Sequence, residues 1–320
     1  MIFLVAITAL SSLNAEAGSA RARVRFTERA LTGEALIVYA ATTEPMNLRG
    51  IAIGGVRFEE DMGDGAFTGT KLARAEIFLD GRPYSTDVQG PIALRLQDQG
   101  GLVNLATLDD RGFGRLAALL GMNTESVRGL RARTMDYTDS DALEQINGAE
   151  KSKYGSATIA NRTLRRPSEW LSVLGIRNAV QGRAWQRLKT SITADPAAPY
   201  WNVNTATPTT LRVLLGMTDR EIEASIRERG QRPLTSLSDL GAAAGMALTD
   251  DPEQIYTFPN GKIVFEIRDG RSRWTYRGRV VLTPSRPERP FWVDQHETLE
   301  TPDPTGTELS NAEPFPYAAN

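Results

Sequence analysis

The first thirteen residues of the chain carry no charge and read MIFLVAITALSSL. Charged residues begin at Glu16, and apolar side chains then recur at helical spacing, at Val24, Phe26, Leu31, Ile37 and Val38. No proline occurs before Pro45. The pattern therefore predicts one continuous helix over residues 1–45, about 66 Å long if 44 residues are helical.

The apolar start of this helix allows two interpretations. It is shorter than the roughly 20 residues that span a bilayer. It is consistent with a secretory signal, since Ala15-Glu16-Ala17 fits a cleavage site, although no basic residue precedes the apolar run. It is also consistent with the end of a longer helix whose earlier part lies outside this reading frame. The apolar end continuing into an amphipathic stem favours a membrane-anchored stalk.

Alternating patterns predict strands on both sides of the middle of the chain. In residues 46–102 the strand patterns are Ile51-Ala52-Ile53, Val56-Arg57-Phe58, Ala73 to Leu79 and Ile92 to Leu96, with turn residues at Asp80-Gly81-Arg82-Pro83. In residues 249–285, Ile263, Phe265 and Ile267 alternate with polar residues, and Asp269-Gly270 predicts a hairpin. These segments predict a small antiparallel sheet in two parts.

The second strand of that hairpin carries basic side chains on one face, at Arg271, Arg273, Arg277 and Arg279. Aromatic residues occupy the opposite face, so the pattern favours a solvated face over a nucleic-acid surface. Residues 286–320, rich in proline, are expected to form an unpacked tail.

The middle of the chain, residues 103–248, repeats itself. Three blocks recur in the same order: Val103 to Thr107 as Val203 to Thr207, Leu119 to Met122 as Leu214 to Met217, and Arg166-Pro167 as Arg232-Pro233. Each copy predicts a helical module, with an Asn/Thr helix start, a leucine-rich helix ending in Gly, a second helix and a proline-initiated third. The modules are assigned to residues 103–180 and 203–248.

The modules resemble helix-hairpin-helix or SAM-like domains, some of which bind DNA phosphates through a Gly-x-Gly hairpin. Here the hairpins are Gly121-Met122-Asn123 and Gly216-Met217-Thr218, and both lack the second glycine. The 37 Lys and Arg are balanced by 39 Asp and Glu, which leaves few phosphate-neutralising groups. A periplasmic or secreted DNA-binding protein is therefore the alternative function, and no nucleic acid is expected.

The first module carries an acidic insertion. Met122 and Arg166 are 44 positions apart, whereas Met217 and Arg232 are 15 apart, so the insertion has 29 residues. Its acidic residues include Asp136, Asp139, Asp141, Glu144 and Glu150, and no Lys or Arg lies between Asp136 and Glu150. Such a cluster requires a cation, ion pairing or solvation. A calcium-type oxygen site and a solvated acidic loop paired with Lys151, Lys153 or Arg162 both stay open.

Composition excludes several enzyme classes. The chain has 320 residues, no cysteine and one histidine, His296. Thiol nucleophiles, thiolate zinc sites and disulfides are impossible, and a catalytic triad is disfavoured. No acid/base partner is positioned for a carboxylate hydrolase. The sequence therefore predicts a protein that is not an enzyme.

Over residues 1–285 the chain resembles the K-type minor pseudopilins of bacterial type II secretion. The most specific segments are Trp201-Asn202-Val203-Asn204-Thr205-Ala206 and the acidic segment from Asp136 through Gly148-Ala149-Glu150 to Arg165-Arg166-Pro167. The resemblance implies an α+β, pilin-like fold interrupted by the all-α insert. Because family members bind calcium in the helical domain, it implies a calcium site drawn from Asp136, Asp139, Asp141 and Glu150.

The resemblance also implies a role and a location. Such a protein is a single-pass inner-membrane protein whose bulk lies in the periplasm. It caps the pseudopilus tip and initiates assembly with I- and J-type, then H-type, minor pseudopilins during protein export. The family begins with a basic leader and a longer apolar helix, so we expect a start codon assigned too late or another membrane route.

Overall fold

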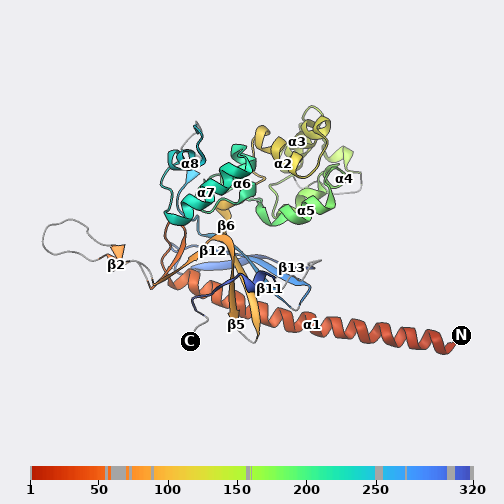
Figure 1. Cartoon of the computed structure of the whole chain (residues 1–320). Helices are drawn as coiled ribbons and strands as arrows, with labels where there is room; N and C mark the ends of the chain where they lie inside the picture. Colours follow the sequence, from red (N-terminus) through yellow and green to blue (C-terminus); the bar gives the residue numbers. More distant parts are fainter. Residues whose placement is uncertain are drawn as a thin grey trace. The chain divides into compact units, whose positions relative to one another are not determined.

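A computed structural model describes residues 2–54, 57–58, 70–71, 74–87, 90–155, 159, 161–248, 255–270, 272–300 and 307–317. The chain divides into two compact units (Figure 1). Unit 1 comprises residues 1–97 and 261–320, and unit 2 comprises residues 98–260. Unit 2 is therefore an insert within the chain of unit 1. Val56, Ala73, Arg271 and residues 249–254, which the sequence assigned to strands, lie outside the described residues.

Unit 1 begins with one long helix, α1 (Ile2–Thr43), close to the predicted bounds. Its inner face buries Phe26, Ala30, Ile37 and Ala40, at the spacing of a helix stripe. Gly33 belongs to the same stripe, and a Cβ there would come within 3.1 Å of Ile92 and Leu94 side-chain atoms. Glycine therefore allows close packing of the helix on the sheet. Among the residues that the structure describes, no helix combines the length and apolar character needed to cross a membrane.

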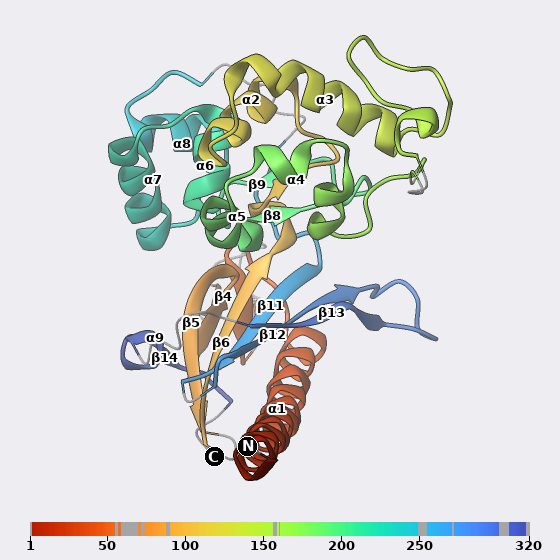
Figure 2. The same ribbon diagram turned by 90° about the vertical axis from the view of Figure 1, so that its right-hand side faces the viewer.

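The sheet that packs against α1 has six strands in the order β13-β12-β11-β6-β5-β14 (Figure 2). They are β5 (Asp80–Asp87), β6 (Pro91–Asp98), β11 (Lys262–Asp269), β12 (Trp274–Leu282), β13 (Phe291–Glu300) and β14 (Glu313–Pro314). Neighbours β6 and β11 come from opposite sides of unit 2 in the sequence. The pairs β5-β6, β11-β12 and β12-β13 are antiparallel, but β14 runs parallel to β5, so the sheet is not purely antiparallel.

The other predicted early strands pair outside this sheet. Strands β1 (Gly50–Ile53) and β4 (Ala75–Phe78) form one antiparallel pair, and β2 (Arg57–Phe58) and β3 (Thr70–Lys71) form another. The turn residues predicted at Asp80 to Pro83 lie inside β5, at an irregularity in its pairing with β6. Gly81 there has φ +80°, which explains the turn-like composition.

The expectation of an unpacked tail was wrong for much of residues 286–320. Strand β13 pairs with β12 along its length, from Phe291 opposite Leu282 to Glu300 opposite Trp274. Further on, the Phe315 side chain is fully buried. Its ring packs edge-on against the Tyr84 ring, with the two ring centroids 5.9 Å apart. The prolines flank β13 rather than interrupt it, so no ladder hydrogen bond is lost to them. A short helix, α9 (Thr307–Ser310), precedes β14.

The prediction of a solvated basic face was wrong at Arg277 and Arg279 of β12, whereas Arg273 is exposed as predicted. Arg277 is only 8% exposed, and Glu266 on β11 and Glu297 on β13 lie opposite it in register. Its guanidinium lies within 4.0 Å of both carboxylates. Arg279 pairs with Asp294 at 2.7 Å. Carboxylates on the neighbouring strands thus neutralise this face.

Unit 2 contains two helical modules (Figure 2). The first consists of β7 (Val103–Asn104), α2 (Asp110–Leu119), α3 (Thr124–Thr138), 3₁₀ helices Lys151–Lys153 and Pro167–Ser172, α4 (Ile176–Ala179), α5 (Gly182–Leu188) and β8 (Ile192–Thr193), after a 3₁₀ turn at Gln99–Gly101 and with another at Lys189–Ser191. The second consists of β9 (Trp201–Asn202), α6 (Pro208–Leu215), α7 (Asp219–Gln231), α8 (Leu237–Ala244) and β10 (Ile255–Tyr256). Each module has its own buried apolar cluster.

A short parallel strand pair closes each module, β7 with β8 and β9 with β10. The repeated asparagines lie at these closures. Asn104 donates to the carbonyls of Asp195 and Ala198, and Asn204 donates to those of Leu234 and Thr257, at 2.7–2.9 Å. Both modules therefore extend beyond their predicted ends at residues 180 and 248.

Candidate metal centre

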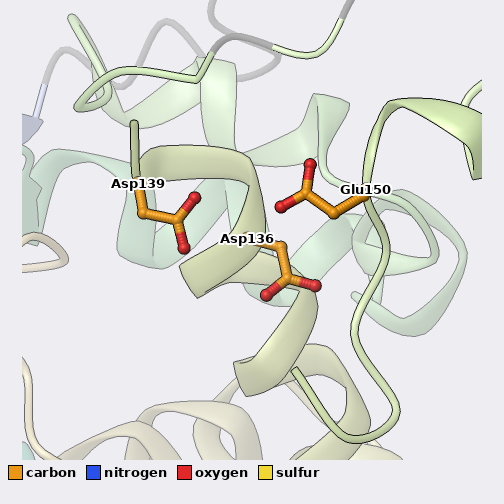
Figure 3. A group of neighbouring side chains, drawn as sticks. All are labelled: Asp136, Asp139 and Glu150. Atoms are coloured by element: carbon orange, nitrogen blue, oxygen red, sulfur yellow. The ribbon is translucent and has the colours of Figure 1, made fainter. Parts of the chain in front are cut away.

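Three of the predicted acidic residues converge in the first module. Asp136 lies in the last turn of α3, Asp139 caps the end of that helix, and Glu150 precedes the 3₁₀ helix Lys151–Lys153. One carboxylate oxygen from each lies within 4.8 Å of the other two (Figure 3). The 29-residue insertion thus folds back so that Glu150 faces the end of α3.

Asp136 organises the returning loop. Its side chain is fully buried and accepts hydrogen bonds from the backbone N–H of Gln145 at 3.1 Å and of Ala149 at 2.7 Å. Gly148 lies against the same carboxylate, and a Cβ built there would overlap Asp136 Oδ2. The Asp136 carboxylate therefore determines the backbone path of the Gly148-Ala149-Glu150 segment.

Glu150 and Asp139 supply oxygens without protein donors. Both carboxylate oxygens of Glu150 and Oδ1 of Asp139 are buried and lack a hydrogen-bond partner within the part of the chain that the structure describes. Burial raises the pKa of the Asp139 carboxyl, and the negative charges of Asp141, Glu150 and Asp136 raise it further. Buried carboxylates that lack donors are costly unless a cation compensates them.

The donor set fits calcium. Calcium takes carboxylate and carbonyl oxygens at about 2.3–2.6 Å, so two ligands of one ion lie up to about 5 Å apart. The three oxygens satisfy this spacing. Zinc and copper sites are usually built from imidazole and thiolate, which this cluster lacks. A calcium ion here would be bound by Asp136, Asp139 and Glu150, and it would neutralise their mutual repulsion.

Asp141, the fourth predicted ligand, lies outside this three-residue cluster. Its side chain is exposed, and its Oδ1 accepts a hydrogen bond from the N–H of Leu143 at 2.8 Å. Glu144 is likewise turned away and pairs with Lys153. Asp141 still acts on the site at longer range, since its charge contributes to the raised pKa of Asp139.

Two polar residues near structural junctions were missed from the sequence. Asn161 has φ +41° and a buried Oδ1 without a partner in the described chain, and its Nδ2 donates to the Asp141 carbonyl at 3.2 Å. A search confined to acidic side chains overlooks such an amide oxygen. The only indication of Asn161 in the sequence was its residue type, since Asn adopts the left-handed backbone region more readily than most residues.

Asp98 is the second missed residue, and it lies where the chain enters unit 2. It is fully buried, and its carboxylate accepts hydrogen bonds from the side chains of Asn202 and Thr205 at 2.8–2.9 Å. The N–H groups of Gly100 and Asn260 donate to its other oxygen at 3.2 Å. Burial raises the pKa of Asp98, and these donors act against the rise. One carboxylate thereby joins both ends of unit 2.

The glycine hairpins do not present free backbone to a phosphate. Gly121 and Gly216 adopt φ +71° and +72° and end α2 and α6. A Cβ on Gly121 would overlap the Gln181 side chain, and one on Gly216 would lie 3.2 Å from the Arg115 guanidinium. Arg115 also donates to the Val213 and Leu214 carbonyls at the end of α6. Contacts within unit 2 therefore occupy both turns, which disfavours the DNA-binding alternative.

Comparison with known proteins identifies the relatives of this chain. The family model "Type II secretion system (T2SS), protein K" matches residues 95–249. Type II secretion system protein K of Pseudomonas aeruginosa strain PAO1 is 29% identical over 167 residues, which are 49% of this chain and 50% of the relative. The match thus spans about half the length of that curated relative.

A solved structure is similar in fold. A chain in the crystal structure of the GspK-GspI-GspJ complex from enterotoxigenic Escherichia coli is similar with a TM-score of 0.50 and 20% identity. The match covers 68% of this chain and 84% of that chain. At this identity the likeness concerns the fold, an α+β arrangement. Over residues 95–249, this chain is thus similar to the family of type II secretion system protein K.

Proposed function

We propose that this protein is a minor pseudopilin that caps the tip of a periplasmic pseudopilus and helps initiate its assembly for protein export. The observation that carries the proposal is the insertion of unit 2 between the neighbouring strands β6 and β11. We expect that a subunit with an inserted domain of this size does not stack as a repeating fibre subunit does. The role is mechanical and requires no bond chemistry.

The proposed partners are I- and J-type minor pseudopilins, followed by the H-type. The name of the similar solved complex, GspK-GspI-GspJ, supports the first two. Helix α1 keeps apolar side chains away from its own sheet, with Val24 58% and Leu31 51% exposed. A long helix with a second apolar stripe gains stability when a partner helix covers it.

The apolar run at the start of α1 is the proposed inner-membrane anchor, with the rest of the chain in the periplasm. Similarity to the family supports this location. The uncharged residues 1–13 precede the first acidic residue, Glu16, and the basic residues from Arg21 onward. In a cell, fractionation is expected to recover the chain with inner-membrane proteins.

Complex formation tests the function. The full chain in detergent is mixed with I- and J-type minor pseudopilins and analysed by size-exclusion chromatography with light scattering. We expect one discrete heteromeric species. The double variant Val24→Gln/Leu31→Gln should shift the equilibrium toward the free chain. A chain that stays monomeric at all concentrations would contradict the proposed tip role.

We also propose that calcium binds Asp136, Asp139 and Glu150 and pins the acidic insertion. The unpartnered oxygens of Glu150 and Asp139 support this assignment. A bound ion at 100 times its dissociation constant adds about 2.7 kcal/mol to stability. Calcium should therefore raise the melting temperature of the chain relative to EDTA, and magnesium should do so less. Identical melting curves in calcium and EDTA would remove the metal from the proposal.

A further inference from the structure

Unit 2 contains a hollow of about 250 Å³ that is separate from the acidic cluster. Its wall is built from both modules and from the segment that connects them, and includes Asn104, Thr107, Asp109, Thr193, Tyr200 and Trp201. Pockets for drug-sized ligands start at roughly 300 Å³. The hollow is therefore suited to a small ligand, about one substituted ring.

Four polar side chains around this hollow are not used by other groups of the described chain. Within the described ranges of the chain, no side-chain hydrogen bond is made by the hydroxyls of Thr107, Thr193 and Tyr200 or by the indole N–H of Trp201. Thr193 is only 4% exposed, whereas Thr107 is exposed and Tyr200 and Trp201 are half-buried. Water in the hollow can satisfy such groups, and a ligand whose own polar groups replace this water can hydrogen-bond them directly.

Two aromatic residues, Tyr200 and Trp201, contribute to the lining of the hollow. Tyr200 packs edge-on against Tyr256, with ring centroids 4.6 Å apart and an interplanar angle of 71°. Trp201 lies in β9, and its backbone pairs with Ile255 of β10. Rings of this kind offer an apolar face together with a polar edge. The site therefore needs little reorganisation before binding.

The few charged residues that line the hollow restrict the kind of ligand that it can bind. Asp109 is the one charged residue among those that line the hollow, and its Oδ1 accepts a hydrogen bond from Gly112 N–H as the cap of α2. No cationic side chain is present in this lining to attract a phosphate or carboxylate. Hydroxyl groups, which donate and accept, dominate the free polar groups.

We propose that this hollow binds one residue of a neutral sugar. The apolar C–H face of a pyranose ring matches the Tyr200 and Trp201 rings, and its hydroxyls match the unpartnered groups of Thr107, Thr193 and Tyr200. The proposal goes beyond the pseudopilus role, and it depends neither on calcium nor on membrane anchoring. A protein in the periplasm would meet such a ligand in polysaccharide.

Titration of the full chain in a detergent that carries no sugar headgroup tests the proposal, with maltotriose and the trimer of N-acetylglucosamine as probes. We expect saturable millimolar binding of at least one probe by calorimetry, together with a change in tryptophan fluorescence. Thr193→Val and Tyr200→Phe should each weaken binding about fivefold to tenfold, the loss of one hydrogen bond. Trp201→Phe should remove the fluorescence change.

The matched control is Tyr256→Phe, which removes a hydroxyl from a ring outside the lining and should leave the affinity unchanged. Melting temperatures separate binding from folding, since the Tyr200 hydroxyl has no protein partner to lose. Failure of both sugars to saturate, or binding that the three variants leave intact, would overturn the proposal. Saturable, Tyr200-dependent binding of trialanine or inorganic phosphate in place of sugar would overturn it as well.

Discussion

Glu150 is the side chain of the acidic cluster that would gain most from a bound cation. Its two oxygens are buried without donors in the described chain, while Lys151 and Lys153, the next basic residues, are exposed and turned elsewhere. Asp136, by contrast, is satisfied by two backbone N–H groups. Asp136 therefore shapes the loop, whereas Glu150 is the residue whose contribution depends most on a cation.

Replacing Glu150 by Gln should weaken calcium binding by at least about tenfold, since even outer-shell changes at metal sites cost 10- to 100-fold. In EDTA, E150Q should be as stable as the parent chain or more stable, because a buried charge has been removed. Calorimetric calcium titration and thermal melts measure both effects.

The matched control is Glu144→Gln, the same chemical change in the same loop at a residue that pairs with Lys153. Its calcium affinity should remain within about twofold of the parent value, as expected for an exposed ion pair. Equal losses in both variants would show that only net charge matters at this loop.

The pH dependence of stability should reveal Asp139. Because burial and neighbouring charges raise its pKa in the folded state, its ionised form destabilises the metal-free fold above that pKa. Asp139 also caps the C-terminal end of α3, where a negative charge is unfavourable. In EDTA, D139N should be about 0.5 kcal/mol more stable than the parent at pH 7.

That difference should close as the pH falls below the ordinary pKa of Asp, because the parent carboxyl is then protonated in both the folded and the unfolded state. Urea denaturation at several pH values measures it. Saturating calcium should reverse the sign at pH 7, because the ion stabilises the ionised ligand. A gap that widens on acidification would contradict the raised pKa.

Gly148 should tolerate no side chain. Its Cβ would overlap Asp136 Oδ2, so Gly148→Ala must displace the carboxylate that orders the loop. We expect a loss of about 2–3 kcal/mol in denaturant unfolding, as for other overpacked buried sites. Gly230→Ala, within α7 where a Cβ meets nothing within 4 Å, should instead gain about 0.5–1 kcal/mol.

Residue chemistry was partly predictable from the sequence. Five like charges without a basic residue indicated a cation or a solvated loop, and the structure brings three of the four predicted ligands together. Asp141 differs because its side chain is exposed and its Oδ1 accepts a hydrogen bond from the N–H of Leu143. Asp98 was not predictable, because its partners at Asn202 and Asn260 lie more than 100 residues away in the chain.

Periodicity predicted the secondary elements well where one face is buried and the other is exposed. Helix α1 follows its stripe closely, whereas strands β11 and β12 lie where they were predicted but are largely buried on both faces. The proline content led to the wrong prediction for residues 286–320. Prolines at both ends of a strand make the segment look irregular in the sequence, but they do not break the pairing of the strand between them. Phe291, Trp292 and Val293 carried the strand signal there.

Phe315 should contribute as much stability to unit 1 as a core residue. Its ring is fully buried beside Tyr84, so Phe315→Ala should cost about 3–5 kcal/mol of unfolding free energy. Chemical denaturation measures the loss. Phe258→Ala removes the same ring from a site that is 45% exposed, and it should cost under about 1 kcal/mol. If Phe315→Ala lost as little unfolding free energy as Phe258→Ala, the end of the chain would add nothing to the core.

At the scale of the whole molecule, the repeat explains the construction of unit 2. The asparagines of the two Val-Asn blocks, Asn104 and Asn204, each fasten the closure of their module. The sequence revealed the duplication, but it did not reveal the parallel closures, since two-residue strands carry no periodic signal.

Asp98→Ala should loosen unit 2 without affecting unit 1. The change leaves the donors of Asn202 and Thr205 unmatched in a buried place, which costs about 2–4 kcal/mol. Differential scanning calorimetry should show one transition lowered by several degrees and the other unchanged. Asp87→Ala, at an exposed strand end in unit 1, serves as the control. A uniform shift of both transitions would argue against two separately melting units.

The meeting of Asn260 with Asp98 has a consequence for how such a protein could arise and be altered. A domain whose first and last residues touch occupies no more of its host than a tight turn does. It can be gained, lost or exchanged by a single splice, and the strands on either side keep their partners. Unit 2 is in that sense a separable insertion, and a short glycine linker between residues 97 and 261 should leave a unit 1 that still folds.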